Sequence, residues 1–108
     1  MRTYAVTGAN GYLGSFLCQF IKQQNCRVIS LQRSRNDKGA GENSGFFSLK
    51  HLPSPQVFKG AEVLVHCAYD PIPLSWKDIS EVNVQGSIRL LQAAQAGGIK
   101  QIIYISSI

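Results

Sequence analysis

Residues 7–14 have the sequence TGANGYLG, with glycines at positions 8, 11 and 14. The six residues at 2–7, RTYAVT, have the β-branched and aromatic side chains that favour a strand. Residues 12 to about 24 carry apolar side chains at intervals of three and four, which is typical of a helix with one buried face. The order of strand, glycine turn and helix indicates an α/β fold. The helix residues predicted to be buried are Leu13, Phe16, Leu17, Phe20 and Ile21.

The glycine turn has the features of an anion-binding site. Its three glycines let the backbone turn tightly, approach a ligand closely and pack the helix against the sheet. The turn directs free N–H groups and the positive end of the helix dipole at an anion, and a pyrophosphate is the natural occupant. A turn that needs glycine for structure alone is the alternative. The nucleotide contacts expected from this turn are Gly8, Asn10, Gly11, Tyr12, Leu13 and Gly14.

Outward from the turn, strand and helix patterns alternate along the chain. The run EVLVHCA at 62–68 is nearly continuous apolar, as expected of a parallel strand buried on both faces. Residues 33–45 carry three glycines and almost no apolar side chains, which predicts a surface loop. A helix predicted at 76–96 ends at the glycines 97–98. The other expected elements are strands at 27–32, 46–49 and 101–106, a helical turn starting at 53–55 and a proline-rich loop at 70–73.

These elements predict a doubly wound parallel sheet of about five strands, the Rossmann fold, with right-handed crossovers. With 108 residues, of which 44% are hydrophobic and 16% charged, the chain can bury a core, which excludes a disordered or collagen-like protein. We expect one domain over residues 1–108.

No apolar run approaches the ~20 residues that a bilayer span requires, and residues 1–3 lead into a strand rather than a signal peptide. Cys18, Cys26 and Cys67 have no C-x-x-C spacing, and an odd number of cysteines cannot form a closed disulfide framework. We therefore predict a cytoplasmic protein with reduced thiols and no membrane partner.

Eleven Lys and Arg against six Asp and Glu give a net charge of +5, which favours phosphate-bearing partners. The charge alone does not distinguish a nucleic acid from a small molecule. No recognised nucleic-acid module is present, and a basic cluster at 33–38 accounts for part of the excess. We expect no nucleic-acid partner.

Four motifs resemble those of the extended branch of the short-chain dehydrogenase/reductase superfamily, the NAD-dependent epimerase/dehydratase family. Residues 7–14 are similar to its cofactor loop, with the spacing G-x-x-G-x-x-G. Residues 61–68 (AEVLVHCA) resemble its fourth-strand pattern D-x-V-x-H-x-A-A, and residues 83–94 (NVQGSIRLLQAA) resemble its N-V-x-G-T-x-N-L-L-x-A-A helix. Residues 103–107 (IYISS) resemble its V-Y-x-S-S fifth strand. The resemblance covers essentially the whole chain. It implies the N-terminal NAD(P)-binding Rossmann portion of a longer oxidoreductase-type enzyme, truncated before the substrate domain.

The resemblance implies further cofactor contacts after the fourth strand and on the following helix. These are Cys67, Ala68, Tyr69 and Asn83. Tyr69 replaces the second alanine of the strand motif and brings a phenol beside the expected cofactor path. Glu62 replaces Asp, Ser87 replaces Thr and Arg89 replaces Asn, and we expect the fold to tolerate these changes. In the same pattern His66 serves packing and hydrogen bonding.

The end of the second predicted strand bears on the choice of cofactor. NAD-selective folds place an Asp or Glu there to bind the ribose 2′-hydroxyl. This chain has LQRSR at 31–35 and no carboxylate before Asp37. A guanidinium group and a hydroxyl match a 2′-phosphate. We predict NADP, with Arg33 and Ser34 as contacts and Arg35 next, while NAD and solvated arginines without preference stay open.

The superfamily's proton transfer uses a Tyr phenol and a Lys four residues later, because a phenol of pKa about 10 is a poor base without a neighbouring cation. The resemblance places Ser107 at the position of the hydroxyl that polarises the substrate oxygen. No tyrosine of this chain is followed by lysine at the fourth position. The two histidines and scattered cysteines predict no metal site.

Two functions remain open from the sequence. The first is the NAD(P)-binding part of an enzyme that oxidises, epimerises or dehydrates a nucleotide sugar or related carbonyl compound. Such a part would bind dinucleotide without full catalysis, and would take substrate only if a missing C-terminal half were supplied. The second is a stand-alone NADP-binding or sensor module, or a subunit completed by another chain. The apolar edge of the last strand predicts self-association.

Overall fold

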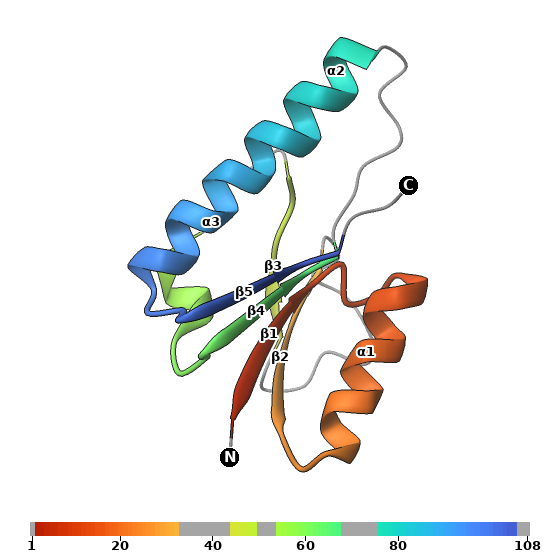
Figure 1. Ribbon diagram of the computed structural model, residues 1–108, viewed down its shortest axis with the longest axis vertical. Coiled ribbons are helices and arrows are strands. Elements are labelled where there is room, and N and C mark those ends of the chain that lie inside the picture. The colour runs from red at the N-terminus through yellow and green to blue at the C-terminus, as the bar shows by residue number, and fades with distance from the viewer. Residues whose placement is uncertain (1, 33–43, 50–53, 68–75, 106–108) are drawn as a thin grey trace.

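The structure is a computed structural model that describes residues 2–32, 44–49, 54–67 and 76–105. Within these ranges, five parallel strands form one sheet in the order β3-β2-β1-β4-β5. Helix α1 (Tyr12–Gln23) covers one face and α3 (Gly86–Ala96) the other (Figure 1). The predicted doubly wound parallel sheet is confirmed. The strands are β1 (Thr3–Thr7), β2 (Arg27–Gln32), β3 (Ser44–Phe46), β4 (Val63–His66) and β5 (Gln101–Tyr104).

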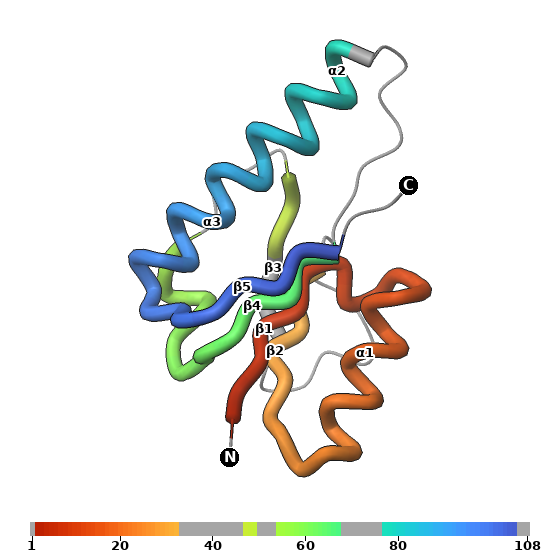
Figure 2. Tube along the Cα trace, in the orientation of Figure 1, coloured from red at the N-terminus to blue at the C-terminus, as the bar shows by residue number. Residues whose placement is uncertain are grey.

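Strand β1 lies at the centre of the sheet. From β1 the chain passes to β2 and β3 on one side, then returns to β4 and β5 on the other side (Figure 2). The order therefore reverses between β1 and β4. Because all strands are parallel, their carboxyl ends meet at one edge, where Thr7 of β1 pairs with His66 of β4. In open α/β sheets, the crevice at such a reversal is where ligands bind.

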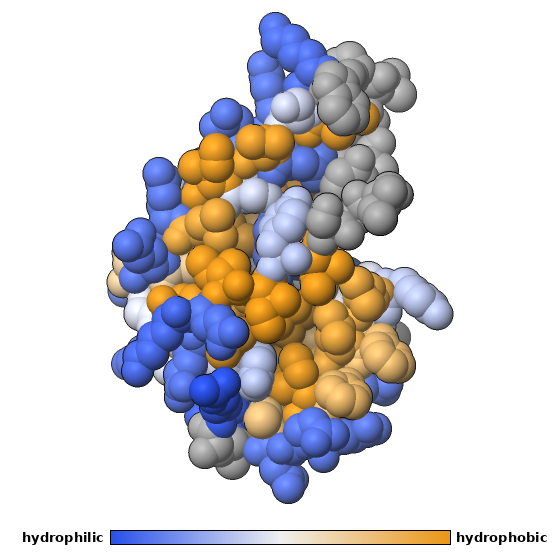
Figure 3. Space-filling model, in the orientation of Figure 1, coloured by the Kyte–Doolittle hydropathy of each residue, from blue (hydrophilic) through white to orange (hydrophobic). Residues whose placement is uncertain are grey.

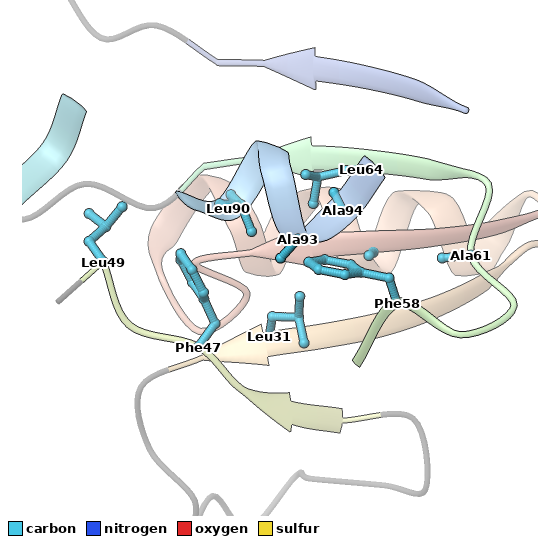
Figure 4. Packing of buried hydrophobic residues seen from close by; sticks show 10 residues of the cluster. Leu31, Phe47, Leu49, Phe58, Ala61, Leu64, Leu90, Ala93 and Ala94 are labelled. Atoms are coloured by element: carbon cyan, nitrogen blue, oxygen red, sulfur yellow. The ribbon is translucent and has the colours of Figure 1, made fainter. Parts of the chain in front are cut away.

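Two apolar layers hold the helices to the sheet. On one face, small and branched side chains of α3 pack over Leu31, Leu64 and Phe58, the last from the 3-10 turn η1 (Pro55–Phe58) (Figure 4). On the other face, Cys18 of α1 packs in a cluster with valines of β1, β2 and β4. The α3 residues in the first layer are Leu90, Ala93 and Ala94.

The predicted buried face of α1 is wrong in part. Leu13, Phe16 and Phe20 are 41%, 63% and 51% exposed. Gly14 and Cys18 are buried instead, with two half-buried neighbours, Leu17 and Ile21. The contact face contains small residues because α1 starts directly against the glycine turn, where only a small side chain fits. The larger apolar residues therefore lie on the flank of the helix.

Several predicted boundaries shift. Strand β3 starts at Ser44, inside the predicted loop 33–45, and ends at Phe46, so a strand over 46–49 is wrong. The apolar strand predicted at 62–68 is confirmed but shorter. The helical turn predicted near 53–55 is confirmed as η1, capped by the Ser54 hydroxyl. The loop predicted at 70–73 lies outside the described residues.

The long helix predicted at 76–96 contains an unexpected segment. Helix α2 (Trp76–Ser80) continues into a π-helical segment, η2 (Glu81–Gln85), and then into α3 without a break. A π-helical turn holds one extra residue, so it changes which side chains face the sheet. Among the described residues, no helix has both the length and the apolar character needed to cross a bilayer.

Candidate functional site

The turn after β1 needs glycine at two positions. Gly8 has a φ of +65°, in the left-handed region. A Cβ atom on Gly14 would lie 2.0 Å from the carbonyl oxygen of Gly8, so no other residue allows α1 to approach the turn so closely. The N–H of Gly11 donates to the same carbonyl at 2.9 Å and closes the turn. The glycines thus bring the first turn of α1 against the end of β1.

The N-terminus of α1 presents backbone donors that no side chain caps. Its N-cap residue, Gly11, makes no side-chain cap hydrogen bond, and its first turn contains no acidic residue. The first N–H groups of a helix lack partners within the helix and form the positive end of its dipole. Asn10 and Gly11 are exposed, as are Leu13 and, at 97%, Tyr12. An anion such as a phosphate can therefore reach this helix end.

A buried chain of hydrogen bonds links the carboxyl ends of β1 and β4 to α3. Oγ1 of Thr7 lies 2.6 Å from Nδ1 of His66 and accepts the Cys67 N–H at 3.0 Å. Nε2 of His66 lies 2.8 Å from Oγ of Ser87, in the first turn of α3. Thr7 and His66 are 0% and 1% exposed. We refer to Thr7, His66 and Ser87 as the polar chain.

Two aromatic rings pack around His66. Its ring centroid lies 6.3 Å from that of Phe47, edge to face, and 5.4 Å from that of Tyr104. Burial lowers the pKa of His66 to about 4, so the imidazole is neutral at pH 7. With both nitrogens engaged by hydroxyl groups, the ring is a structural link rather than a free base.

Cys67 follows β4 and is half-buried. Burial is the main cause that raises the pKa of its thiol, and the nearby Cys18 thiol adds to it. Cys67 is therefore a protonated thiol at neutral pH and contributes its backbone N–H, bound to Thr7, rather than a nucleophile.

Asn83 lies in η2, one helical turn before Ser87. Its side-chain Nδ2 donates to the carbonyl oxygen of Ile79 at 3.0 Å, and the side chain is half-buried. This bond ties η2 to a carbonyl of α2, at the junction where backbone pairing changes from the regular pattern to the π-helical one. Asn83 and Ser87 share one side of the helix because they are four residues apart.

An open cavity of about 510 Å³ lies beside η2. Arg89 donates from its guanidinium to the carbonyl oxygen of Leu49 at 2.7 Å and so fixes the segment after β3 to α3. None of the lining residues is a predicted cofactor contact. The described residues that line the cavity are Leu49, Glu81, Val82, Gln85 and Arg89.

The structure gathers some predicted site residues and does not describe others. The glycine turn and Cys67 follow paired strand ends, and the polar chain connects them to the helix of Asn83. The predicted contacts outside the described residues are Arg33, Ser34, Arg35, Ala68, Tyr69 and Ser107. In the described ranges, no group of three or more metal-ligating side chains occurs.

Sequence reasoning missed the linking roles of Thr7 and Ser87. In the sequence, Thr7 is the last residue of a strand before a glycine, and Ser87 is a substitution in a helix motif. Neither position by itself indicates a hydrogen-bond partner. A usable signal was the presence of polar side chains at the last position of two apolar strands. Parallel strands place such residues at the same edge, and buried polar groups require partners.

Comparisons with known proteins agree with this architecture. The sequence model of the NAD dependent epimerase/dehydratase family matches residues 4–108. L-arabinose 1-dehydrogenase (NAD(P)(+)) of Haloferax volcanii is 27% identical over 109 residues, which cover 99% of this chain and 41% of that protein.

Two solved structures from Agrobacterium tumefaciens, each 25% identical, have the same fold. A short-chain dehydrogenase/reductase superfamily protein with bound NAD matches 98% of this chain and 33% of its own, with a TM-score of 0.77. A uronate dehydrogenase variant complexed with NAD matches 99% of this chain and 41% of its own, with a TM-score of 0.75. The chain thus spans less than half the length of these relatives.

Proposed function

The chain belongs to the NAD-dependent epimerase/dehydratase family, and on this premise we propose that it binds a nicotinamide dinucleotide across the carboxyl edge of its sheet. The pyrophosphate lies against the turn at 8–14 and the N-terminus of α1. The crevice between β1 and β4, where the strand order reverses, receives the rest of the dinucleotide. Residues 1–108 act as one dinucleotide-binding domain.

One observation carries this proposal: the exposed N-terminus of α1 has neither a side-chain cap nor an acidic residue, and it is held against β1 by the contact of Gly14 with Gly8. Helix ends of this kind bind phosphate through backbone N–H groups and the helix dipole. Both solved relatives described above carry NAD.

A charge at position 12 tests the location of the pyrophosphate. A carboxylate at a helix N-terminus stabilises the helix by about 0.3–1 kcal/mol, yet it repels a bound anion. We expect Tyr12→Glu to weaken dinucleotide binding at least about tenfold, because like charges placed together cost several kcal/mol. The free energy of unfolding should not fall. Calorimetric titration and urea unfolding measure the two quantities.

Tyr12→Gln is the matched control, since it removes the exposed ring without adding a charge. It should bind dinucleotide within about threefold of the unaltered chain, a difference well under the tenfold that corresponds to 1.4 kcal/mol. Equal affinities of Tyr12→Glu and Tyr12→Gln would contradict the proposed pyrophosphate position.

We propose NADP as the preferred dinucleotide. The support is the sequence LQRSR at 31–35, in which Arg33, Ser34 and Arg35 offer donors to a 2′-phosphate and no carboxylate precedes Asp37. The same titration, run with NADPH and NADH, should give the lower Kd for NADPH. Arg33→Glu should reverse this order, because a carboxylate suits a free 2′-hydroxyl. A lower Kd for NADH in the unaltered chain would overturn the preference.

For the parent reaction we propose hydride chemistry on a sugar, nucleotide sugar or related carbonyl compound. The support is the curated relative, named as an L-arabinose dehydrogenase, and the solved uronate dehydrogenase. By motif position Ser107 polarises the substrate oxygen. No tyrosine in residues 1–108 has a lysine four positions later, so these residues bind dinucleotide without turnover. Sugar-dependent NADPH oxidation by the 108-residue chain would contradict this.

We also propose that the chain associates with itself through β5, whose four residues are all exposed. The three free cysteines support a reducing compartment, the cytoplasm.

A further inference from the structure

The polar chain joins three segments that carry expected cofactor contacts. Thr7 is the last residue before the glycine turn, and His66 directly precedes Cys67. Ser87 lies one helical turn after Asn83. A shift in any one of these hydrogen bonds therefore moves one part of the dinucleotide site relative to the others.

We propose that His66 is a positioning residue, whose Nε2–H tautomer bridges Thr7 and Ser87 and so fixes the glycine turn relative to α3 for dinucleotide binding. The proposal rests on the function proposed above. In the proposed dinucleotide binding, the three residues of the polar chain contact neither the pyrophosphate nor the substrate.

We assign the direction of these hydrogen bonds from the Thr7 hydroxyl, which has one hydrogen to donate. Its oxygen accepts the Cys67 N–H at 3.0 Å, and its hydrogen can point along the 2.6 Å contact to Nδ1 of His66. A neutral imidazole carries one hydrogen, so Nδ1 as acceptor leaves Nε2–H to donate to Oγ of Ser87 at 2.8 Å. The neutral state agrees with the lowered pKa of about 4.

Packing keeps the ring in this orientation. Phe47 contacts it edge to face and Tyr104 is tilted against it, so residues after β3 and in β5 limit rotation of the imidazole. Groups that orient a binding site act best when their own rotamers are held by such contacts. His66 has these contacts on the face of the sheet that α3 covers.

Isosteric replacements test the role. Thr7→Val keeps the shape but removes the donor to Nδ1 and the acceptor for the Cys67 N–H. Ser87→Ala removes the acceptor for Nε2–H. We expect Ser87→Ala, which loses one buried hydrogen bond, to raise the Kd for dinucleotide about tenfold, and Thr7→Val, which loses two, to raise it at least as much. Thr7→Ser and Ser87→Thr keep the hydroxyl groups and should restore the Kd to within about threefold.

A matched control separates positioning from general loss of stability. Val28 is 3% exposed and pairs with Tyr4 in the first half of β1, away from the carboxyl edge. Val28→Ala should lower the free energy of unfolding without changing the Kd. Nitrogen-15 NMR of the side chain should show His66 as the Nε2–H tautomer in the unaltered chain.

Three results would overturn the proposal: unchanged Kd values in both Thr7→Val and Ser87→Ala, an equal rise in Kd in Val28→Ala, or an Nδ1–H tautomer. If the unaltered chain bound neither NADPH nor NADH, the function proposed above would fail, and the positioning role with it. Binding by the unaltered chain with unaffected variants would remove the positioning role alone.

Discussion

His66 makes the stability of the fold depend on pH. The side chain is 1% exposed, and burial lowers its pKa from the ordinary value of 6.5 to about 4. Between these two pH values the unfolded chain binds more protons than the folded chain. The free energy of unfolding therefore falls as the pH falls through this range, and the contribution is fully present above about pH 6.5.

Replacing His66 by a non-titrating residue should remove this dependence. Between pH 7 and pH 5 the unaltered chain should lose about 2 kcal/mol more free energy of unfolding than His66→Gln, because the folded imidazole stays neutral while the unfolded one is protonated. Urea unfolding at both pH values measures the difference. Equal pH dependence in His66→Gln and the unaltered chain would contradict the argument.

At the scale of elements, helix α1 contacts the sheet through small residues, and its larger apolar side chains lie on the exposed flank. Cys18 is buried in the α1 layer, and Leu17 and Ile21 contact that layer. The exposed Phe16 and Phe20 contribute little to the attachment of the helix. The distribution follows from the close contact of Gly14 with the turn, which sets how the helix is rotated about its axis.

This rotation predicts an unequal response to substitution. Phe16→Gln and Phe20→Gln should each change the free energy of unfolding by no more than about 0.5 kcal/mol, since both side chains are more than half exposed. Ile21→Ala should cost about 2 kcal/mol, because it removes packed apolar atoms and leaves a cavity. Urea unfolding ranks the variants. A larger loss in Phe16→Gln than in Ile21→Ala would contradict the packing of α1 through Cys18, Leu17 and Ile21.

The elements also show what the sequence predicts well. The sequence predicts the bounds of β1, β2 and α1 almost to the residue, and it predicts the glycine turn between β1 and α1. The family assigned from four motifs is confirmed. The buried face of α1 is predicted only in part, because periodicity identifies apolar residues but not which of them meet the sheet. The π-helical segment η2 changes hydrogen bonding without any clear residue signature, so it was not predicted either.

One part of the candidate site can be predicted from the sequence and another part cannot. Its glycine turn has a local signature, since strand, turn and helix adjoin in sequence. The polar chain joins residues 59 and 21 positions apart, and its partners are identified only when the strands are placed side by side. A buried histidine in an apolar strand indicates that hydrogen-bond partners exist, but the sequence does not name them.

For the whole molecule, the exposed large apolar side chains of the described residues concentrate around one edge of the sheet. Figure 3 shows apolar side chains extending over α3, β5 and α1 on one face. In the described part of the chain, β5 pairs only with β4, so its other edge has unpaired backbone groups. The exposed large apolar side chains of the described residues are Tyr12, Leu13, Phe16, Phe20, Val84, Ile88, Ile102, Ile103 and Tyr104.

Self-association of the 108-residue chain should follow from this edge. An apolar edge strand pairs readily with another chain, and a lysine on it opposes such pairing. We expect light scattering to give a mass above that of the monomer, and Ile103→Lys to shift the mass toward the monomer. Ile103 is 39% exposed, so its substitution should affect the free energy of unfolding only slightly. A monodisperse monomer of the unaltered chain would contradict self-association.

The central position of β1 has a consequence for the order of folding. Thr3 pairs with Arg27, close in sequence, whereas Thr7 meets His66 across 59 residues. Closing the longer loop costs more chain entropy, and contacts of large sequence separation form late. During synthesis, β1 emerges from the ribosome before β2 and β4, and it gains its second neighbour only after β4 emerges. The glycine turn at 8–14 therefore forms before β4 can fix the end of β1.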